Sequence, residues 1–484
     1  MTFRNKMILR MTKTPSLLLL LLIVLLGIGV RLIFLDRPMR LDESNTFISY
    51  VSQPLDYALS NYDRPNNHLL NTGLMYIAYK LFGNYPPVLR LPAFLAGVLL
   101  IPAVYFTGKK LYDDRTGLIA AALTSVWMTL IDYSVNGRGY TLQALFFILL
   151  IGLGRYLILS KNNKYLWGVF ALLSALGFYA IPTMFYGMGI ISLWMIAMIW
   201  RTYQGQERIR YLWYLFGALG FGAVITILLY LPPILNTGLD TMLGNRFISG
   251  DSPETGYLTF KNIPWMVKDI IFVGTPHLLL ALFLVLSLWV DKKKNQIPIS
   301  VIAGAWIVFM LVITPNIPPR RTWVFLIPLV AIWVAAGIDY LWSLTGRYVM
   351  PVVVVLLIGF MLQQSIELLP LSPETGRSDD SEAVALYLME TLQPEDRLMA
   401  NPVVAITVEY YFIYYGYTDY PRIRRIPNSQ FLRSSQGKRV WAIVQTSREF
   451  DEQFPNLVDM ELDLSLIEKF AGIEIFEVTY EANP

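Results

Sequence analysis

Residues 16–35 read SLLLLLLIVLLGIGVRLIFL, and residues 36–45 continue DRPMRLDESN. The first stretch is almost wholly apolar and has the length that a helix needs to cross the hydrocarbon core of a bilayer. It is too long for the core of a signal peptide, and no small-x-small cleavage site follows it, so we interpret it as an uncleaved first span. Asp42 and Glu43 lie a few residues beyond its end. Carboxylates are costly to hold near hydrocarbon, which makes this pair a candidate functional site.

The composition of the whole chain is that of a membrane protein. Of its 484 residues 55% are hydrophobic and 15% are charged, with a mean hydropathy of +0.48, whereas soluble domains average about 25% charged residues. Apolar runs of spanning length recur, and we count about eleven. They cover residues 16–35, 89–108, 116–134, 139–159, 165–181, 184–200, 211–232, 270–290, 297–314, 322–342 and 349–369. We therefore predict a polytopic α-helical membrane protein.

Several classes of chemistry are excluded by the residue types. The chain has no cysteine and two histidines, which excludes disulfides, thiolate chemistry and a histidine-rich metal centre. Gly-rich phosphate loops, Ser-His-Asp orders and zinc-ligand spacings are absent from the sequence. We expect no nucleic-acid partner.

A shorter run at 68–83, which carries Asn71 and Lys80, decides the predicted topology. If it does not cross the membrane, the basic clusters after the later spans fall on the same side as the basic N-terminus; if it crosses, each of them moves outward. The positive-inside rule therefore predicts that 68–83 lies on the outer surface or dips in and returns. The N-terminus is then cytoplasmic, and the loop 36–88, the loop 233–269 and the C-terminus are extracytoplasmic.

The composition changes to a soluble pattern near residue 371. Ser378–Asp379–Asp380 can cap a helix that runs to about Leu392, and Asn401–Pro402 can open another. Strand-like runs cover residues 397–400, 439–445 and 473–480. We predict a transmembrane domain over residues 1–370, which includes the outer loop 36–88, and a small extracytoplasmic α/β domain over residues 371–484. The second domain shows no catalytic motif, and we interpret it as a cap over the outer mouth.

Three arginines at outer helix starts are candidate phosphate ligands. Arg320 and Arg321 follow two prolines at the start of one span, and Arg138 stands two residues before Tyr140 at the start of another. A guanidinium group grips phosphate oxygens in a fork, and the amides of a helix N-terminus add to the favourable field. The alternative is that these arginines only anchor helix ends at the headgroup level, which is common.

The outer loop 36–88 holds the remaining candidates and is far longer than a helix connector needs to be. Its polar groups just before the short run are Arg64, Asn66, Asn67 and His68. The carboxylates of Asp42 and Glu43 suit proton abstraction from an acceptor hydroxyl. Asp42 also suits a divalent cation, Mg or Mn, beside a phosphate. For His68 the alternative is a polar cap of the helix that follows.

Several short motifs occur in a fixed order along the chain. They are the acidic pair after the first span, Asn66-Asn67-His68, Leu81-Phe82-Gly83, Leu89-Arg90-Leu91-Pro92-Ala93, Lys109-Lys110-Leu111-Tyr112, Tyr133-Ser134, Arg138-Gly139-Tyr140, and Pro319-Arg320-Arg321 leading to Leu326-Ile327-Pro328-Leu329. This order resembles the C-type membrane glycosyltransferases of the protein O-mannosyltransferase and aminoarabinose transferase group. The likeness covers most of residues 16–345 and is best over 40–145.

The resemblance implies a sugar transfer from a polyprenyl phosphate to an acceptor, with inversion at the anomeric carbon. It implies that Asp42 is the base or metal ligand, with Glu43 as its neighbour, and that Arg320 and Arg321 stabilise the leaving phosphate. Arg138, Tyr140, Arg64, Asn66, Asn67 and His68 complete the predicted substrate-binding residues. Relatives often carry His-Pro-Pro where this chain has Asn66–His68. They often carry Glu-Ala where it has Asn136–Gly137, so no carboxylate acts at position 136.

We therefore expect an inverting glycosyltransferase at the outer face of the plasma membrane. Its expected partners are a polyprenyl-phosphate-linked sugar, membrane lipids and a lipid, glycan or protein acceptor. The alternatives are a transporter or flippase of lipid-linked saccharides, which should carry mid-membrane charges in broken helices and repeated halves, and a catalytically inactive scaffold. The enzyme hypothesis requires that the acidic pair and the arginine pair converge at one extracytoplasmic rim.

Overall fold

The computed structural model describes residues 3–160, 164–243, 268, 271–294, 296–313, 318–345, 348–372 and 376–480. The chain divides into two compact units. The first consists of Met1–Leu35, Asp56–Met75 and Arg90–Leu371, and the second of Asp36–Leu55, Tyr76–Leu89 and Ser372–Pro484. Most of the predicted outer loop 233–269 lies outside the described residues.

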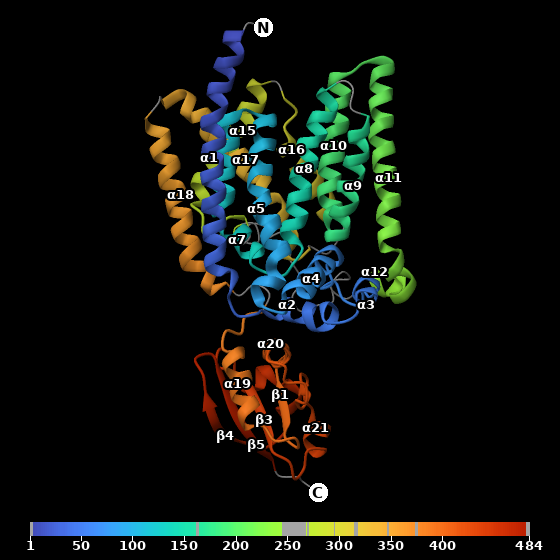
Figure 1. Cartoon of the computed structure of the whole chain (residues 1–484), viewed down its shortest axis with the longest axis vertical. Helices are drawn as coiled ribbons and strands as arrows, with labels where there is room; N and C mark the ends of the chain where they lie inside the picture. Colours follow the sequence, from blue (N-terminus) through green and yellow to red (C-terminus); the bar gives the residue numbers. More distant parts are fainter. Residues whose placement is uncertain are drawn as a thin grey trace. The chain divides into compact units, whose positions relative to one another are not determined.

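The first unit is a bundle of helices, as Figure 1 shows. Its elements are α1 (Phe3–Leu35), α3 (Leu55–Ser60), α4 (Leu69–Phe82), α5 (Pro86–Leu111), α6 (Asp114–Val126), α7 (Met128–Ser134), α8 (Tyr140–Leu159), α9 (Tyr165–Ala180), α10 (Met184–Thr202), α11 (Gly205–Thr237), α12 (Leu239–Leu243), α15 (His277–Lys293), α16 (Ile299–Ile313), the 3₁₀ helix η4 (Arg320–Leu326), α17 (Ile327–Thr345), α18 (Val349–Leu368) and η5 (Leu369–Leu371). The ends of α3, α4 and α5 reach into the second unit.

The helical membrane fold predicted from the sequence is confirmed. Among the described residues, seven helices are long and apolar enough to cross a membrane, or eight if the bent pair α6 and α7 counts as one span. Each of the eleven predicted runs coincides with one of the helices or with this bent pair, but α9, α15 and α16 are shorter than the length that this test requires. The predicted count of eleven spans therefore stays a prediction.

Helix α4 covers most of the short run 68–83, whose place on the outer surface stays a prediction. It has 14 residues, and at 1.5 Å per residue it is about 21 Å long. That length falls short of a hydrocarbon core of roughly 30 Å.

A buried arginine holds the bend between α6 and α7. The two helices are inclined by 61° at a break beside Trp127. The guanidinium group of Arg31, on α1, is fully buried and donates to the Ser125 carbonyl at the end of α6 (3.0 Å) and to Ser134 Oγ on α7 (3.1 Å). A cation that donates to the last carbonyls of a helix supplies the partners that the break removes. Arg31 therefore stabilises the one sharp bend that the predicted span 116–134 contains.

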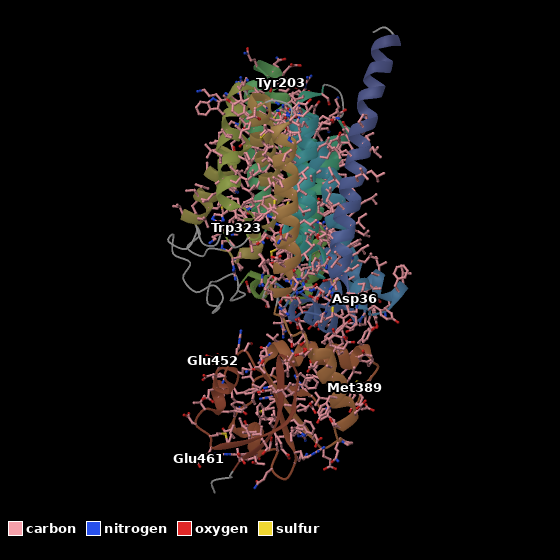
Figure 2. All side chains as sticks on the ribbon, turned by 90° about the vertical axis from the view of Figure 1, so that its left-hand side faces the viewer. Asp36, Tyr203, Trp323, Met389, Glu452 and Glu461 are labelled. Carbon is pink, nitrogen blue, oxygen red and sulfur yellow. The ribbon has the colours of Figure 1, made fainter. Side chains whose placement is uncertain are left out.

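The two ends of the bundle can be followed in Figure 2. Tyr203, between α10 and α11, lies at one end, and Trp323, in η4, lies nearer the opposite end. Tyr203 stands beside the basic residues Arg201 and Arg208, which the sequence predicts to be cytoplasmic. Trp323 follows Arg320 and Arg321, which the sequence predicts to be extracytoplasmic.

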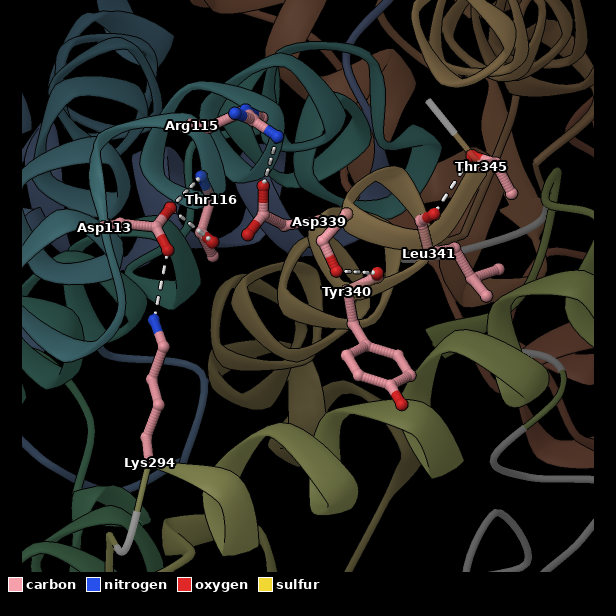
Figure 3. Close-up of polar contacts among 9 residues, drawn as sticks. Asp113, Arg115, Thr116, Lys294, Asp339, Tyr340, Leu341 and Thr345 are labelled. Carbon is pink, nitrogen blue, oxygen red and sulfur yellow. Dashed lines mark hydrogen bonds and ion pairs between the residues drawn. The ribbon is translucent and has the colours of Figure 1, made fainter. Parts of the chain in front are cut away.

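Ion pairs join two of the predicted cytoplasmic loops (Figure 3). Lys294 Nζ lies 3.0 Å from Asp113 Oδ2, and Arg115 lies 3.2 Å from Asp339. Burial by itself raises the pKa of Asp113, but the hydrogen bonds from Thr116 and Lys294 outweigh it and lower that pKa. These partners are partly exposed, so each pair contributes less than about 1 kcal/mol. They do place two basic loops at one end of the bundle, in line with the positive-inside rule.

The second unit contains a five-stranded sheet with the order β2-β1-β3-β5-β4. Its strands are β1 (Arg397–Ala400), β2 (Ile423–Arg424), β3 (Val440–Gln445), β4 (Leu462–Lys469) and β5 (Ile473–Tyr480), and its helices are α2 (Leu41–Thr46), the π-helix η1 (Phe47–Val51), α19 (Ser381–Thr391), α20 (Pro402–Tyr414), α21 (Ser429–Arg433), α22 (Phe450–Gln453) and the 3₁₀ helix η6 (Pro455–Leu457). Strand β1 pairs in parallel with β2 and β3, and β5 pairs antiparallel with β3 and β4. The small α/β domain predicted near the C-terminus is therefore present.

The second unit joins that α/β domain to two stretches of the outer loop. The sequence, read along the chain, assigns residues 36–55 and 76–89 to the loop of the transmembrane domain. The contacts of the described residues instead group them with residues 372–484. Asp42 and Glu43 therefore belong to the same compact unit as the C-terminal sheet.

The close packing of α1, α5 and α7 predicts a stability effect at Gly97. A Cβ at Gly97 would lie 2.0 Å from Ser134 Oγ and 3.4 Å from Arg31 Nε, so we expect Gly97→Val to destabilise the chain by about 1–3 kcal/mol through overpacking. Thermal unfolding of the detergent-purified protein measures the change. Gly217→Val is the control, because a Cβ there meets no heavy atom within 4 Å. Equal unfolding temperatures for the two variants would contradict the packing.

Candidate active site

The first unit brings three predicted substrate-binding residues together around Arg138. The side chain of Arg138 is 2% exposed. Its Nη1 donates to the backbone carbonyl of Asn66 (2.8 Å) and to the Asn66 side-chain oxygen. Its Nη2 lies 3.3 Å from Nε2 of His68. Residues that stand about 70 positions apart in the sequence therefore form one buried cluster.

The backbone fixes the tautomer of His68. The amide of Gly139 donates to Nδ1 of His68 at 2.9 Å, so Nδ1 carries no proton and the neutral ring holds its proton on Nε2. Nε2–H and the guanidinium Nη2 of Arg138 are then two donors side by side. An acceptor with several lone pairs, such as a phosphate oxygen, can receive hydrogen bonds from both.

The surroundings keep His68 neutral. Its pKa is well below the ordinary 6.5, because burial removes water from the ring and because the positive charges of Arg138 and Arg321 oppose a further one. Arg321 therefore acts on the same cluster, although it comes from η4 and stands far along the chain. His68, Arg138 and Arg321 therefore form a region of positive potential in the first unit, near the start of α4.

Aromatic rings line this cluster. The ring of Tyr140 lies edge-on to His68 at 5.0 Å and to Tyr133 at 4.8 Å. The guanidinium carbon of Arg138 lies 5.9 Å from the centre of the Tyr140 ring, a cation–π contact. Gly139 permits the close approach, because a Cβ there would lie 3.2 Å from His68 Nδ1. All three residues of the Arg138-Gly139-Tyr140 motif thus contact the imidazole of His68.

Other predicted substrate-binding residues have different local roles. Asn67 is fully buried, donates to the carbonyls of Ala58 and Asn61 at 2.9 and 2.7 Å, and accepts from Thr72 at 2.7 Å. These contacts fold the loop that carries His68. The side chain of Arg64 is exposed and lies 3.8 Å from the carboxylate of Asp63.

Arg320 and Arg321 open η4, after Pro319 in an extended conformation. Both side chains are partly exposed. The two arginines therefore remain accessible at a helix start, which is the arrangement that the sequence predicts.

Two further residues of the cluster were not predicted. Asn71, which is 1% exposed, donates to the Gly137 carbonyl at 3.0 Å and so ties α4 to the Arg138 turn. Tyr62 is buried, and burial raises its pKa to about 12, while Arg138 lowers it and Tyr140 raises it further. Asn71 carried a signal, since an amide inside an apolar run needs a partner. Nothing near Tyr62 in the sequence marks it.

The acidic pair has two different environments in the second unit. Glu43 is fully buried, and its Oε1 accepts from the backbone amide of Arg40 at 3.0 Å, which caps α2. Asp42 is partly exposed on the same helix. Of the two carboxylates, only that of Asp42 is therefore on a partly exposed residue. The predicted convergence of the acidic pair with Arg320 and Arg321 joins residues of different units and stays a prediction.

The described residues do not form a metal site of their own. Within the described ranges, no group of three or more His, Cys, Asp or Glu side chains could hold a metal ion. Asp42 offers one carboxylate, whereas a hard divalent cation needs about six oxygen ligands. The predicted Mg or Mn ion stays a prediction.

Comparisons with known proteins bear on the fold. Residues 71–230 match the family model described as dolichyl-phosphate-mannose-protein mannosyltransferase. ArnT from Cupriavidus metallidurans in the apo state is similar with a TM-score of 0.62 at 13% identity, over 94% of this chain and 97% of that chain. The chain has the C-type membrane glycosyltransferase fold. The resemblance stated from the sequence motifs is thereby confirmed.

Two further solved structures with this C-type fold contain lipid phosphates. ArnT bound to undecaprenyl phosphate is similar with a TM-score of 0.60 at 14% identity, over 94% of this chain and 97% of that chain. The archaeal oligosaccharyltransferase AglB from Archaeoglobus fulgidus, in complex with an inhibitory peptide and a dolichol-phosphate, is similar with a TM-score of 0.54 at 10% identity, over 90% of this chain and 70% of that chain. No curated protein sequence matches the chain.

The depressed pKa of His68 predicts a pH dependence of stability. Below about pH 6.5 the unfolded chain binds a proton at His68 that the folded chain does not, so stability falls as the pH decreases from 6.5. This slope is at most about 1.4 kcal/mol per pH unit. We expect His68→Gln, which stays neutral, to lose less stability than the wild type on acidification.

Unfolding temperatures between about pH 7 and 5.5 measure this difference. His277→Gln is the control, because the side chain of His277 is exposed, and it should keep the wild-type slope. A His68→Gln variant with the wild-type slope would show that His68 is not held neutral by the cluster.

Proposed function

We propose that this protein is an inverting glycosyltransferase that takes its sugar from a polyprenyl phosphate at the outer face of the plasma membrane. The observation that carries the proposal is the pair of donors at His68 Nε2 and Arg138, with the charge of Arg321 acting on the same ring. A neutral imidazole and a guanidinium group both donate hydrogen bonds, so they bind a phosphate without taking up or releasing a proton. The C-type fold supports the same class of enzyme.

In this mechanism the cluster holds the phosphate of the donor. Arg138 and His68 donate hydrogen bonds to its oxygens, and Arg321 adds positive charge. As the bond between the anomeric carbon and the phosphate oxygen breaks, negative charge grows on that oxygen. The same donors then stabilise the transition state more than the ground state, which is what accelerates the reaction.

Asp42 acts as the general base. The acceptor hydroxyl transfers its proton to the Asp42 carboxylate while its oxygen attacks the anomeric carbon opposite the phosphate. One carbon–oxygen bond forms, one breaks, the configuration inverts and the polyprenyl phosphate leaves. Glu43 supports this step only by capping the helix that carries Asp42. The acceptor is a lipid, glycan or protein with a free hydroxyl.

A flippase of lipid-linked saccharides is the second candidate. The observation in its favour is the buried Arg31 at the broken helix pair α6 and α7, since transporters use such features at mid-membrane. Arg31, however, donates to Gly27, Ser125 and Ser134 of its own bundle, which gives it a structural role. A flippase needs the phosphate cluster but has no use for a base at Asp42.

Transfer activity separates the two functions. Radiolabelled lipid-linked sugars extracted from metabolically labelled cells serve as the donor, and transfer of label to total envelope acceptors is measured. We expect Asp42→Asn to reduce transfer at least about 100-fold, because general-base catalysis contributes roughly 10²–10⁴-fold. Binding of undecaprenyl phosphate should be unchanged in this variant.

Asp56→Asn is the matched control, because the side chain of Asp56 is exposed in the same outer loop, and it should keep wild-type transfer. Wild-type transfer by Asp42→Asn would overturn the enzyme mechanism. If the wild type moves labelled lipid across vesicles without transferring its sugar, the flippase is correct.

A further inference from the structure

The helix that carries the acidic pair is too short to be stable by itself. Helix α2 has six residues, and isolated helices shorter than about 12–15 residues are marginal in water. Glu43 satisfies one amide at its start. The direction in which Asp42 points must therefore be set by what α2 packs against. Within the second unit that partner is α20, a helix of the C-terminal α/β domain.

Two hydrogen bonds from backbone amides hold the chain on both sides of Arg40, the N-cap residue of α2. The hydroxyl of Tyr411, on α20, accepts from the Met39 amide at 3.1 Å. The carbonyl of Gly376 accepts from the Leu41 amide at 2.9 Å. Leu41 is the first residue of the helix, whose amide has no acceptor inside the helix. The C-terminal domain thus supplies the acceptors that anchor the start of α2.

The neighbouring tyrosine of α20 holds the other end of the same segment. The ring of Tyr410 lies edge-on to Phe47 at 5.5 Å, and its hydroxyl donates to the Asn84 carbonyl at 2.6 Å. Phe47 also contacts Tyr79 edge-on at 5.3 Å. Tyr410 and Phe47 are fully buried. Aromatic contacts of this kind and buried hydrogen bonds each contribute about 1 kcal/mol.

Gly376 brings its carbonyl to Leu41 through a special backbone conformation. Its φ is +74°, in the region that favours glycine, and a Cβ there would lie 2.7 Å from Leu41 Cβ. The contact between the C-terminal domain and α2 is therefore close and specific in shape.

We propose that Tyr411 and Gly376 are positioning residues for Asp42, so that the C-terminal domain is a working part of the active site and not only a cap. This proposal rests on the proposed function, because it assumes that Asp42 is the general base. Positioning matters because a displacement of about 1 Å at a reacting group can cost 10²-fold in rate. The phosphate cluster around His68 belongs to the other unit.

Tyr411→Phe in the full-length protein tests the proposal. The change removes the hydroxyl that accepts from Met39 and keeps the ring. Transfer from the extracted lipid-linked donor is measured over a dilution series, which gives apparent kcat and KM relative to the wild type. We expect kcat to fall about 5- to 100-fold, with KM for the donor and undecaprenyl phosphate binding within twofold. Gly376→Ala should show the same pattern.

Tyr415→Phe is the matched control. Its hydroxyl donates to Glu382 at 2.6 Å, at the end of the same helix, so kcat should not change. A wild-type kcat in both Tyr411→Phe and Gly376→Ala would overturn the positioning role. So would a joint change of kcat, KM and unfolding temperature, which is the mark of a merely structural role.

The two proposals fail in different ways. If Asp42→Asn abolishes transfer while Tyr411→Phe keeps the wild-type kcat, the enzyme mechanism stands and the positioning role falls. If Asp42→Asn keeps full activity, the enzyme mechanism itself falls.

Discussion

A buried guanidinium group is the constraint on which the first unit depends. Arg138 is almost wholly removed from water, and a buried charge is tolerated only when it is paired or hydrogen-bonded. Asn66 and the ring of Tyr140 meet this need on two sides. The loop before α4, the turn before α8 and the imidazole of His68 are ordered around it. In the proposed function this burial is preorganisation, since the donors are in place before a phosphate binds.

The second unit holds the short helix that carries Asp42. A carboxylate on a six-residue helix has no fixed direction by itself, and the outer loop that carries it is long. Folding that loop onto α20 gives Asp42 a defined place through contacts that span more than 300 residues of sequence. The proposed phosphate-binding residues and the proposed base thus belong to separate compact units.

Much of the helical framework could be predicted because hydropathy and capping are local signals. The cap at Asn401 is an example, since its side chain accepts from the amides of Val403 and Val404 as the Asn-Pro pair predicts. The bend at Trp127 could not be predicted, because the apolar run 116–134 continues through it and the bend depends on Arg31 from another helix. Strand β4 is not predicted from the sequence, although Leu462, Leu464 and Leu466 alternate with other residues. It lies at an exposed edge of the sheet, so its sequence lacks the continuous apolar run of a buried strand.

The site was predictable in its residue types but not in its partners. The arginines were predicted from charge at helix starts and His68 from the family resemblance, yet nothing in the sequence pairs His68 with the Gly139 amide or Asp42 with the C-terminal domain. Such pairings are long-range and leave no periodic trace. Asn67, which the resemblance implies to be substrate-binding, makes contacts that fold the loop, and the sequence does not predict these partners.

The most direct test of this account compares the binding of undecaprenyl phosphate and undecaprenol to the purified full-length protein. The two lipids differ only in the phosphate, so their affinity ratio isolates the contribution of the His68–Arg138 cluster. We predict that the wild type binds the phosphate at least about tenfold more tightly, a difference of about 1.4 kcal/mol, and that Arg138→Gln loses this preference. An equal affinity for both lipids in the wild type, or an unchanged preference in Arg138→Gln, would contradict it.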